Sequence, residues 1–180
     1  WTIAVPTAPF YWSIIDRPYD PLRTWDELIA QRAPVVGLGA SDAHEHRVLG
    51  LKFAPYEVMF RIVRTHLLIP SGTLTEHAVY EAIRRGHAYA SIELLNPAGG
   101  FSFLAEQAGR VVGIMGDTVP LTPGLRLQAA LPERAAITVF KDGRPIATDS
   151  AQAWQMPVMQ LVAPGPRVTM QTPVRWAARE

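Results

Sequence analysis

The sequence predicts an α/β segment followed by an all-β module, and two observations lead to this fold class. Between residues 21 and 95, stretches with apolar residues at helical spacing alternate with short apolar runs, as in folds built from helices and parallel strands. From Asn96 onward, short apolar runs are separated by Gly, Pro and Asp without a helical period, which is typical of β-sandwiches. We therefore expect two domains, residues 1–95 and a small all-β sandwich domain over residues 96–180.

The first part of the α/β segment predicts one helix, one strand and a polar loop. Residues 22–32 carry apolar side chains at helical spacing, and Thr24 and Glu27 form a capping box for this short helix. Residues 35–39 (VVGLG) are apolar on both faces, as in a buried parallel strand, and the polar loop 41–46 (SDAHEH) follows. In α/β folds the chemistry lies where strands end at their C-terminal edge, so this loop is the first place to expect a site.

The rest of the α/β segment predicts an extended stretch and a helix. Residues 56–69 are rich in β-branched and apolar residues and favour an extended segment, with a helix as the alternative. Residues 73–85 give the clearest helix in the chain, because Thr73 and Glu76 form a capping box and Gly86 supplies the C-terminal stop.

Strands are expected at residues 87–95 and throughout the all-β module. In the module they fall at residues 101–106, 111–115, 125–131, 136–141, 145–148, 158–162 and 167–171. Asp142 and Gly143 stand between two of them, and both tolerate the positive φ of a type I′ turn, which predicts a hairpin.

The composition excludes several classes of function. The chain is 48% hydrophobic and 18% charged with a net charge of +1, and its Lys and Arg are scattered, so no basic stripe predicts a nucleic-acid partner. No apolar run reaches the ~18–20 residues of a transmembrane segment. The absence of cysteine excludes disulfides and thiolate ligands. Trp1 in place of Met, followed by the apolar and aromatic residues 3–13, leads us to expect the later part of a longer polypeptide.

Asp42 and His44 lie two residues apart after the predicted strand 35–39. In an extended segment residues i and i+2 face the same way, so both side chains can bind one cation. A carboxylate oxygen combined with an imidazole nitrogen suits zinc, manganese or iron better than calcium. The alternative is that Asp42 caps the next turn and His44 is a surface residue. His66, within an apolar segment, is expected to be a packed or hydrogen-bonded residue and not a ligand.

Four short motifs together resemble a known family. They are residues 39–44 (GASDAH), Arg64 with Thr65, residues 81–86 (EAIRRG) and residues 89–91 (YAS). In this order they are similar to the C-terminal part of the PHP (polymerase and histidinol phosphatase) superfamily. Within it they most resemble the CehA-like branch of metal-dependent phosphoesterase-like hydrolases, whose barrel is followed by a β-sandwich. The resemblance covers most of the chain.

The resemblance implies the C-terminal part of a distorted (β/α)7 barrel with up to three divalent metal ions at the strand ends. The last metal-binding motif of the family, Asp-x-His, matches Asp42 and His44. The opening His-x-His and the middle Glu and His ligands of the family have no match, so the N-terminal half of the barrel is expected to be supplied by the parent chain. Beside the pair, Arg47 and Arg64 are candidate phosphate contacts and His46 is a candidate substrate contact, with solvated surface roles as the alternative.

The function expected from this resemblance is metal-dependent hydrolysis of a small phosphoester or ester. Clustered cations lower the pKa of a bound water to about 7 and neutralise charge on the reacting oxygen. This chain by itself is expected to be inactive, and relatives of the branch are often exported. The alternative function is a non-catalytic module, in which a degenerate barrel remnant supports a β-sandwich that binds carbohydrate or a protein partner.

Overall fold

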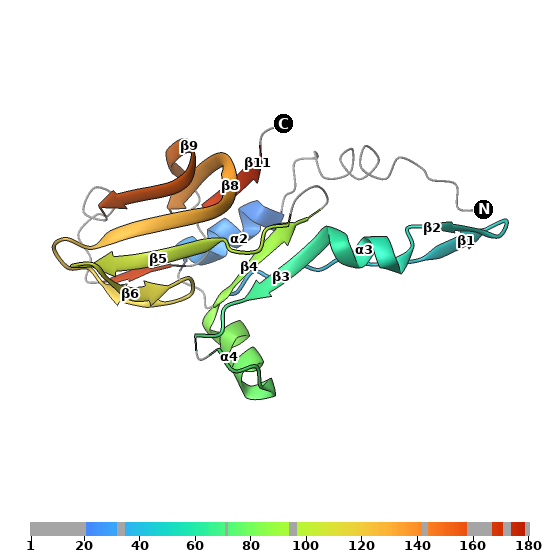
Figure 1. Ribbon diagram of the computed structural model, residues 1–180, viewed down its shortest axis with the longest axis horizontal. Coiled ribbons are helices and arrows are strands. Elements are labelled where there is room, and N and C mark those ends of the chain that lie inside the picture. Colours follow the sequence, from blue (N-terminus) through green and yellow to red (C-terminus); the bar gives the residue numbers. More distant parts are fainter. Residues whose placement is uncertain are drawn as a thin grey trace.

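The computed structural model describes residues 21–31, 35–70, 72–93, 97–141, 144–157, 167–170 and 174–178. The helices among these residues are α2 (Pro21–Ala30), α3 (Tyr56–Ile62) and α4 (Glu76–Arg85). The strands are β1 (His46–Val48), β2 (Leu51–Phe53), β3 (Val63–Leu67), β4 (Ala88–Ile92), β5 (Ser102–Gln107), β6 (Arg110–Ile114), β7 (Thr118–Pro120), β8 (Arg126–Lys141), β9 (Arg144–Pro157), β10 (Arg167–Thr169) and β11 (Val174–Ala178). Figure 1 shows their arrangement. No helix in the described part of the chain is long and apolar enough to cross a membrane.

The predicted part of a (β/α)7 barrel is wrong. Such a barrel is built from parallel strands that alternate with helices, but every strand pair within the described ranges is antiparallel. Residues 35–39 form no regular strand, and Leu38 is 51% exposed. The strands on either side of α4, β3 and β4, pair antiparallel with each other, with His66 opposite Tyr89. The described residues are therefore mostly β, in antiparallel sheets.

The predictions made from local sequence in the first half of the chain are partly confirmed. Residues 56–69 begin as the helix α3 and become extended only at β3. The helix α4 is present, but its N-cap is Thr75, whose hydroxyl oxygen accepts from the backbone N–H of Ala78 at 3.1 Å, and not Thr73. Gly86 ends α4 in the left-handed conformation, as predicted, with its N–H bonded to carbonyls of the last turn.

The second half of the chain is organised around β8. This single strand of 16 residues replaces the two shorter strands predicted at 125–131 and 136–141. One of its edges pairs with β9, while the other pairs first with β5 and then with β11. The predicted turn at 142–143 lies outside the described residues, but Lys141 pairs with Arg144 on its two sides, as a hairpin requires. The strand predicted at 158–162 also lies outside them. A two-stranded ribbon, β7 with β10, completes the module.

The hydrophobic core lies inside this β module and extends into β4. Its fully buried members alternate along β8, where Leu127, Ala129, Ile137 and Val139 all point inward. Tyr89 of β4 belongs to the same cluster and packs edge-on against Phe101, with ring centroids 5.1 Å apart. Other members come from the remaining strands and loops of the module, among them Phe103, Met115, Leu125, Trp154 and Met170. The core therefore crosses the predicted boundary at residue 96.

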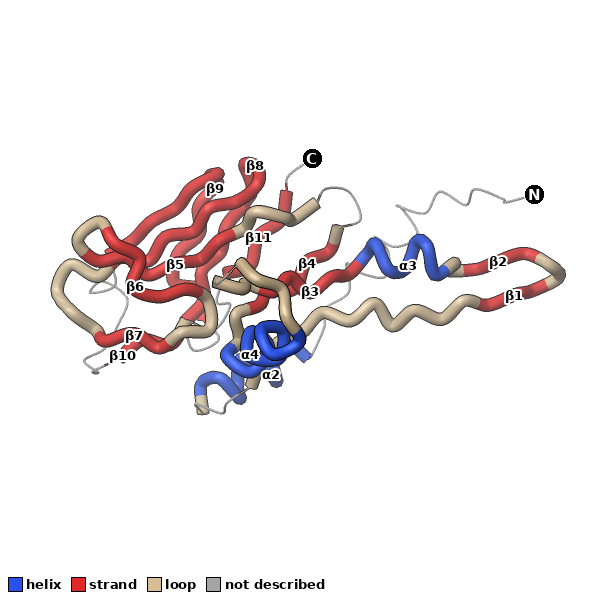
Figure 2. Tube along the Cα trace, turned by 60° about the horizontal axis from the view of Figure 1, so that its bottom comes forward, coloured by secondary structure: helices blue, strands red, loops and turns tan. Residues whose placement is uncertain are grey.

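An arm made of β1, β2 and α3 projects from the rest of the described structure (Figures 1 and 2). Some of its large apolar side chains are exposed: Leu49 in the hairpin turn is 98% exposed, and Tyr56 and Phe60, which are also exposed, stack on one face of α3 with centroids 5.7 Å apart. The loop 35–45 leads from beside α2 out to β1, as Figure 2 shows. This loop carries the residues predicted to bind metal.

Candidate functional site

The loop before β1 brings the two predicted metal ligands together. Oδ1 of Asp42 and Nε2 of His44 are 3.1 Å apart, and their side chains are 90% and 70% exposed. Asp42 has a φ of +45°, a left-handed conformation that Asp tolerates better than most residues. The two side chains therefore converge at the protein surface, where both can be reached from solvent.

The spacing between these two atoms is compatible with binding to one ion. Ligands held at bond lengths of about 2.0–2.2 Å, with angles of about 90–109° between them, lie about 2.8–3.6 Å apart. The observed 3.1 Å between Asp42 and His44 falls within this range. Without an ion, the same geometry is an imidazole–carboxylate hydrogen bond on the surface. The pair therefore fits two positions of a metal site with mixed oxygen and nitrogen ligands.

The rest of a metal site is not seen within the described ranges. They contain no group of three or more His, Asp and Glu side chains that could hold a metal ion. A catalytic zinc site normally has three protein ligands and an open water position. Asp42 and His44 thus supply two ligands at most, and further ligands would have to come from elsewhere.

Thr65 of β3 anchors the start of this loop. Its hydroxyl accepts from the backbone N–H of Gly39 and donates to the carbonyl oxygen of the same residue, both at 2.9 Å. A side chain at position 39 would not fit, because a Cβ atom there would lie 2.9 Å from a methyl group of Val63 and 3.0 Å from Cβ of Ala90. Gly39 therefore packs directly on the β3–β4 pair, three residues before Asp42.

The residues after the pair begin the β1–β2 hairpin, in the outer part of the arm (Figure 2). His46 and Arg47 are the first two residues of β1, and both are exposed. Nε of Arg47 is 3.4 Å from a carboxylate oxygen of Glu45, whose side chain is only 11% exposed. Arg47 and His46 follow Asp42 and His44 within a few residues of chain. Their predicted role as substrate contacts stays a prediction.

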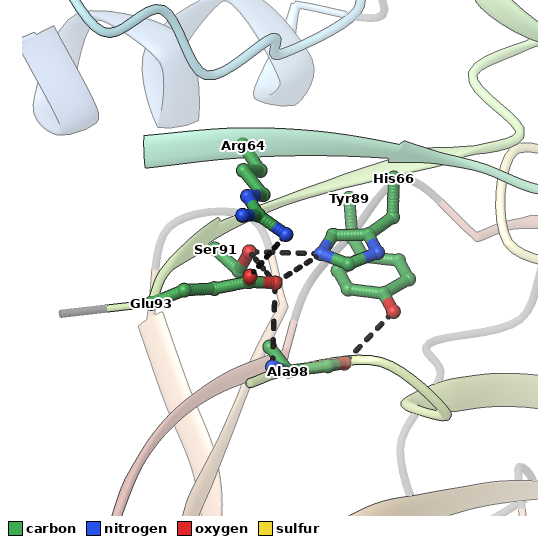
Figure 3. A network of polar contacts seen from close by, with 6 residues as sticks. All are labelled: Arg64, His66, Tyr89, Ser91, Glu93 and Ala98. Atoms are coloured by element: carbon green, nitrogen blue, oxygen red, sulfur yellow. Dashed lines mark hydrogen bonds and ion pairs between the residues drawn. The ribbon is translucent and has the colours of Figure 1, made fainter. Parts of the chain in front are cut away.

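Arg64, the third predicted substrate contact, belongs to a network around Glu93 (Figure 3). Nη1 of Arg64 is 3.0 Å from one carboxylate oxygen of Glu93, and Nε2 of His66 is 2.6 Å from the other. Ser91 Oγ and the backbone N–H of Ala98 also donate to this carboxylate, at 3.2 and 3.3 Å. The side chain of Glu93 is 5% exposed, whereas that of Arg64 is 49% exposed. The network thus holds one end of a guanidinium on a side chain that is about half exposed.

The electrostatics of the network favour an ionised carboxylate. Burial alone raises the pKa of Glu93, but the hydrogen bonds from His66, Ala98 and Ser91 and the charge of Arg64 outweigh it, and the net pKa is lowered. Nearby, burial raises the pKa of the Tyr89 hydroxyl, and the charge of Glu93 raises it further. Tyr89 therefore stays a neutral donor, bonded to the carbonyl of Ala98 at 2.9 Å.

The network resembles a Ser-His-acid triad in composition but not in geometry. A triad uses both ring nitrogens of the histidine, one for the serine and one for the carboxylate. Here Nε2 of His66 is shared between Ser91, at 3.0 Å, and Glu93. The ring also lies flat against Tyr89, with centroids 4.5 Å apart. The expectation that His66 is a hydrogen-bonded packing residue is confirmed.

Sequence reasoning missed Glu93 as the centre of this network. The available signal was the period of two in extended chains: Arg64 and His66 share one face of β3, and Ser91 and Glu93 share one face of the neighbouring chain. Thr65, between Arg64 and His66, points to the opposite face and meets Gly39. A single strand thus connects the candidate metal loop on one side with the carboxylate network on the other.

Comparisons of the chain with protein-family models, with curated proteins and with solved structures found no match in any of the three.

Proposed function

We propose that this chain contributes Asp42 and His44 to the metal site of a metal-dependent hydrolase. The observation that carries the proposal is the 3.1 Å separation of Oδ1 and Nε2 on two exposed side chains, in a loop held by Gly39. The sequence resemblance to the PHP superfamily supports the same role for the same two residues. The proposal rests on this pair and does not require a barrel.

The ion suited to this pair is zinc, manganese or iron, since one ligand is a carboxylate and the other an imidazole. Bound there with its remaining ligands, such an ion would lower the pKa of a coordinated water to about 7 and so supply a hydroxide nucleophile at neutral pH. As in the family that the sequence resembles, the complete site would use up to three ions. The other ligands would come from a further segment of polypeptide.

The substrate class that fits the surrounding side chains is a small phosphoester or ester. Arg47 and Arg64 are both about half or more exposed, and each keeps N–H donors beyond those that face Glu45 and Glu93. Guanidinium groups bind phosphate oxygens in a bidentate manner, so Arg47 would orient an anionic substrate at the pair, whereas Arg64 points to the face of β3 opposite the loop and could reach only a substrate that extends around the strand. His46, exposed beside Arg47, would add a further hydrogen-bonding group.

The test is metal binding by the chain itself. We expect isothermal titration with Zn²⁺ and with Mn²⁺, and metal analysis after purification without chelator, to show binding to the natural chain. The double variant Asp42→Ala with His44→Ala should lose it. The matched control is Asp149→Ala with His77→Ala, which removes an exposed Asp and an exposed His elsewhere.

Two results would contradict the proposal: no binding by the natural chain, or equal binding by the double variant and the natural chain. Either result would favour the alternative, a non-catalytic module that binds carbohydrate or a protein partner. Hydrolysis of p-nitrophenyl phosphate would be measured alongside. Because two ligands fall short of a catalytic site, little activity is expected without the missing ligands.

A further inference from the structure

We propose that Thr65 is the positioning residue of the candidate metal pair, fixing the loop that carries Asp42 and His44 against β3. This inference rests on the proposed function for the role of the pair. The contact itself stands on geometry alone: one hydroxyl bonds to both the N–H and the C=O of Gly39, each at 2.9 Å, across 26 residues of sequence.

The contact takes the place of a strand–strand hydrogen-bond pair. Residues 35–45 form no strand, so the backbone groups of Gly39 find no ladder partner within the described elements. A threonine hydroxyl carries one donor and acceptor lone pairs, so it can satisfy both groups at once. The side chain of Thr65 therefore ties the incoming loop to a sheet that the loop does not join.

The loop is held on both sides of the ligands, by Gly39 before them and by the largely buried Glu45 after them. Asp42 lies three residues after Gly39, in a left-handed conformation, and the chain beyond His44 enters β1, which pairs only with β2 in the described structure. Before Asp42 in the sequence, Gly39 is the residue of this loop that is hydrogen-bonded to the β3–β4 pair. Movement of Gly39 would move Asp42 and His44 with it.

The strand that carries Thr65 is held by contacts on its opposite face. Its neighbours Arg64 and His66 point to the opposite face of β3 and are both bound by the carboxylate of Glu93, at 3.0 and 2.6 Å. The antiparallel partner strand pairs Thr65 with Ala90, whose Cβ is one of the atoms packed against Gly39. The strand that carries the hydroxyl, β3, is therefore fixed by Glu93 on its opposite face and by β4 along one edge.

The experiment compares Thr65→Val with Thr65→Ser in the full chain. Valine keeps the shape of threonine and removes both hydrogen bonds, whereas serine keeps the hydroxyl. Zn²⁺ and Mn²⁺ affinity would be measured by isothermal titration. Positioning partners of metal ligands are worth 10–100-fold in affinity, and since Thr65 acts through the backbone we expect a loss of about tenfold for Thr65→Val.

Serine should restore most of the affinity, and Thr138→Val, at a partly exposed position of β8 away from the loop, should leave it unchanged. Thermal unfolding of all three variants separates the loss of metal affinity from a loss of folding. If the natural chain binds metal and Thr65→Val binds as tightly, the positioning role is refuted and the proposed function stands.

If the natural chain binds no metal, the proposed function fails and the positioning role is decided by amide hydrogen exchange. Faster exchange of Gly39 and of the loop 40–44 in Thr65→Val, with natural rates in Thr65→Ser, would support the role of Thr65 in holding the loop. Unchanged exchange in both variants would refute it.

Discussion

Gly116 lies where the C-terminal end of α4 meets the β module, and replacing it with alanine tests this contact. Gly116 has a φ of +95°, and a Cβ atom there would lie 2.3 Å from the carbonyl oxygen of Arg85 and 2.5 Å from the carbonyl carbon of Gly86. Both contacts are with backbone atoms, which cannot rotate away. Gly124 provides the control, since its φ is +82° and an added Cβ would meet nothing within 4 Å.

The two alanine variants share one cost and differ in another. A left-handed backbone costs a non-glycine residue about 1–2 kcal/mol, and this applies to Gly124→Ala and Gly116→Ala alike. Only Gly116→Ala also forces two backbone segments apart. Overpacking of this kind costs roughly 1–3 kcal/mol more. We therefore expect Gly116→Ala to destabilise the chain by about 2–5 kcal/mol, and Gly124→Ala by about 1–2 kcal/mol.

Thermal and urea unfolding followed by circular dichroism measure the difference. For a chain of this length about 1 kcal/mol lowers Tm by roughly 2–4 °C, so Gly116→Ala should unfold about 10 °C below the natural chain and Gly124→Ala only a few degrees below it. If the two variants have the same stability, α4 does not press on the turn at Gly116, and the packing of α4 against the β module described above is incorrect.

Three further predictions concern the core and two carboxylates. Ile137→Ala should cost about 2–5 kcal/mol of unfolding free energy, because this side chain is fully buried, whereas Val111→Ala, 56% exposed, should stay within about 0.5 kcal/mol in the same urea titration. The hydrogen bond from Arg84 lowers the pKa of Glu81 to about 2, so NMR titration should show that value and Arg84→Ala should raise it; an unchanged pKa would exclude the pairing. The lowered pKa of Glu93 contributes stability that is present above the ordinary carboxyl pKa and lost as pH falls through the lowered one. Glu93→Gln should therefore be less stable than the natural chain at neutral pH and lose less stability on acidification, as measured by unfolding at several pH values; parallel pH curves would refute the role of the network.

Signals that are local in sequence predicted the structure best. Gly86 was predicted to end α4 because a left-handed C-cap favours glycine, and no distant residue is needed for this. The N-cap was placed two residues too early, since Thr73 and Thr75 are both good caps and only the helix register chooses Thr75. Two strands were predicted within the range of β8, but their fusion into one strand of 16 residues was not.

The prediction of a parallel α/β fold was wrong because an apolar run does not determine the direction in which a strand pairs. Residues 35–39 have the composition of a buried parallel strand, yet they lie against α2, where the ring of Trp25 contacts Gly37, and form no ladder. Whether two strands run parallel depends on the path of the chain between them. For the site, Asp42 and His44 converge as expected, but through the left-handed conformation of Asp42 and not through the extended segment that was predicted. The role of Glu93 depends on contacts with residues 27 and 29 positions earlier.

The crossing of residue 96 by the hydrophobic core has a practical consequence for dividing this chain. Tyr89 packs on Phe101 and donates to Ala98, so β4 serves as one wall of the module that follows it in sequence. A shortened protein that starts at residue 96 would leave those apolar surfaces open to water and would be prone to aggregate. Expression of the C-terminal part by itself should therefore start ahead of β4, and ahead of β3 if the partner strand is to be kept.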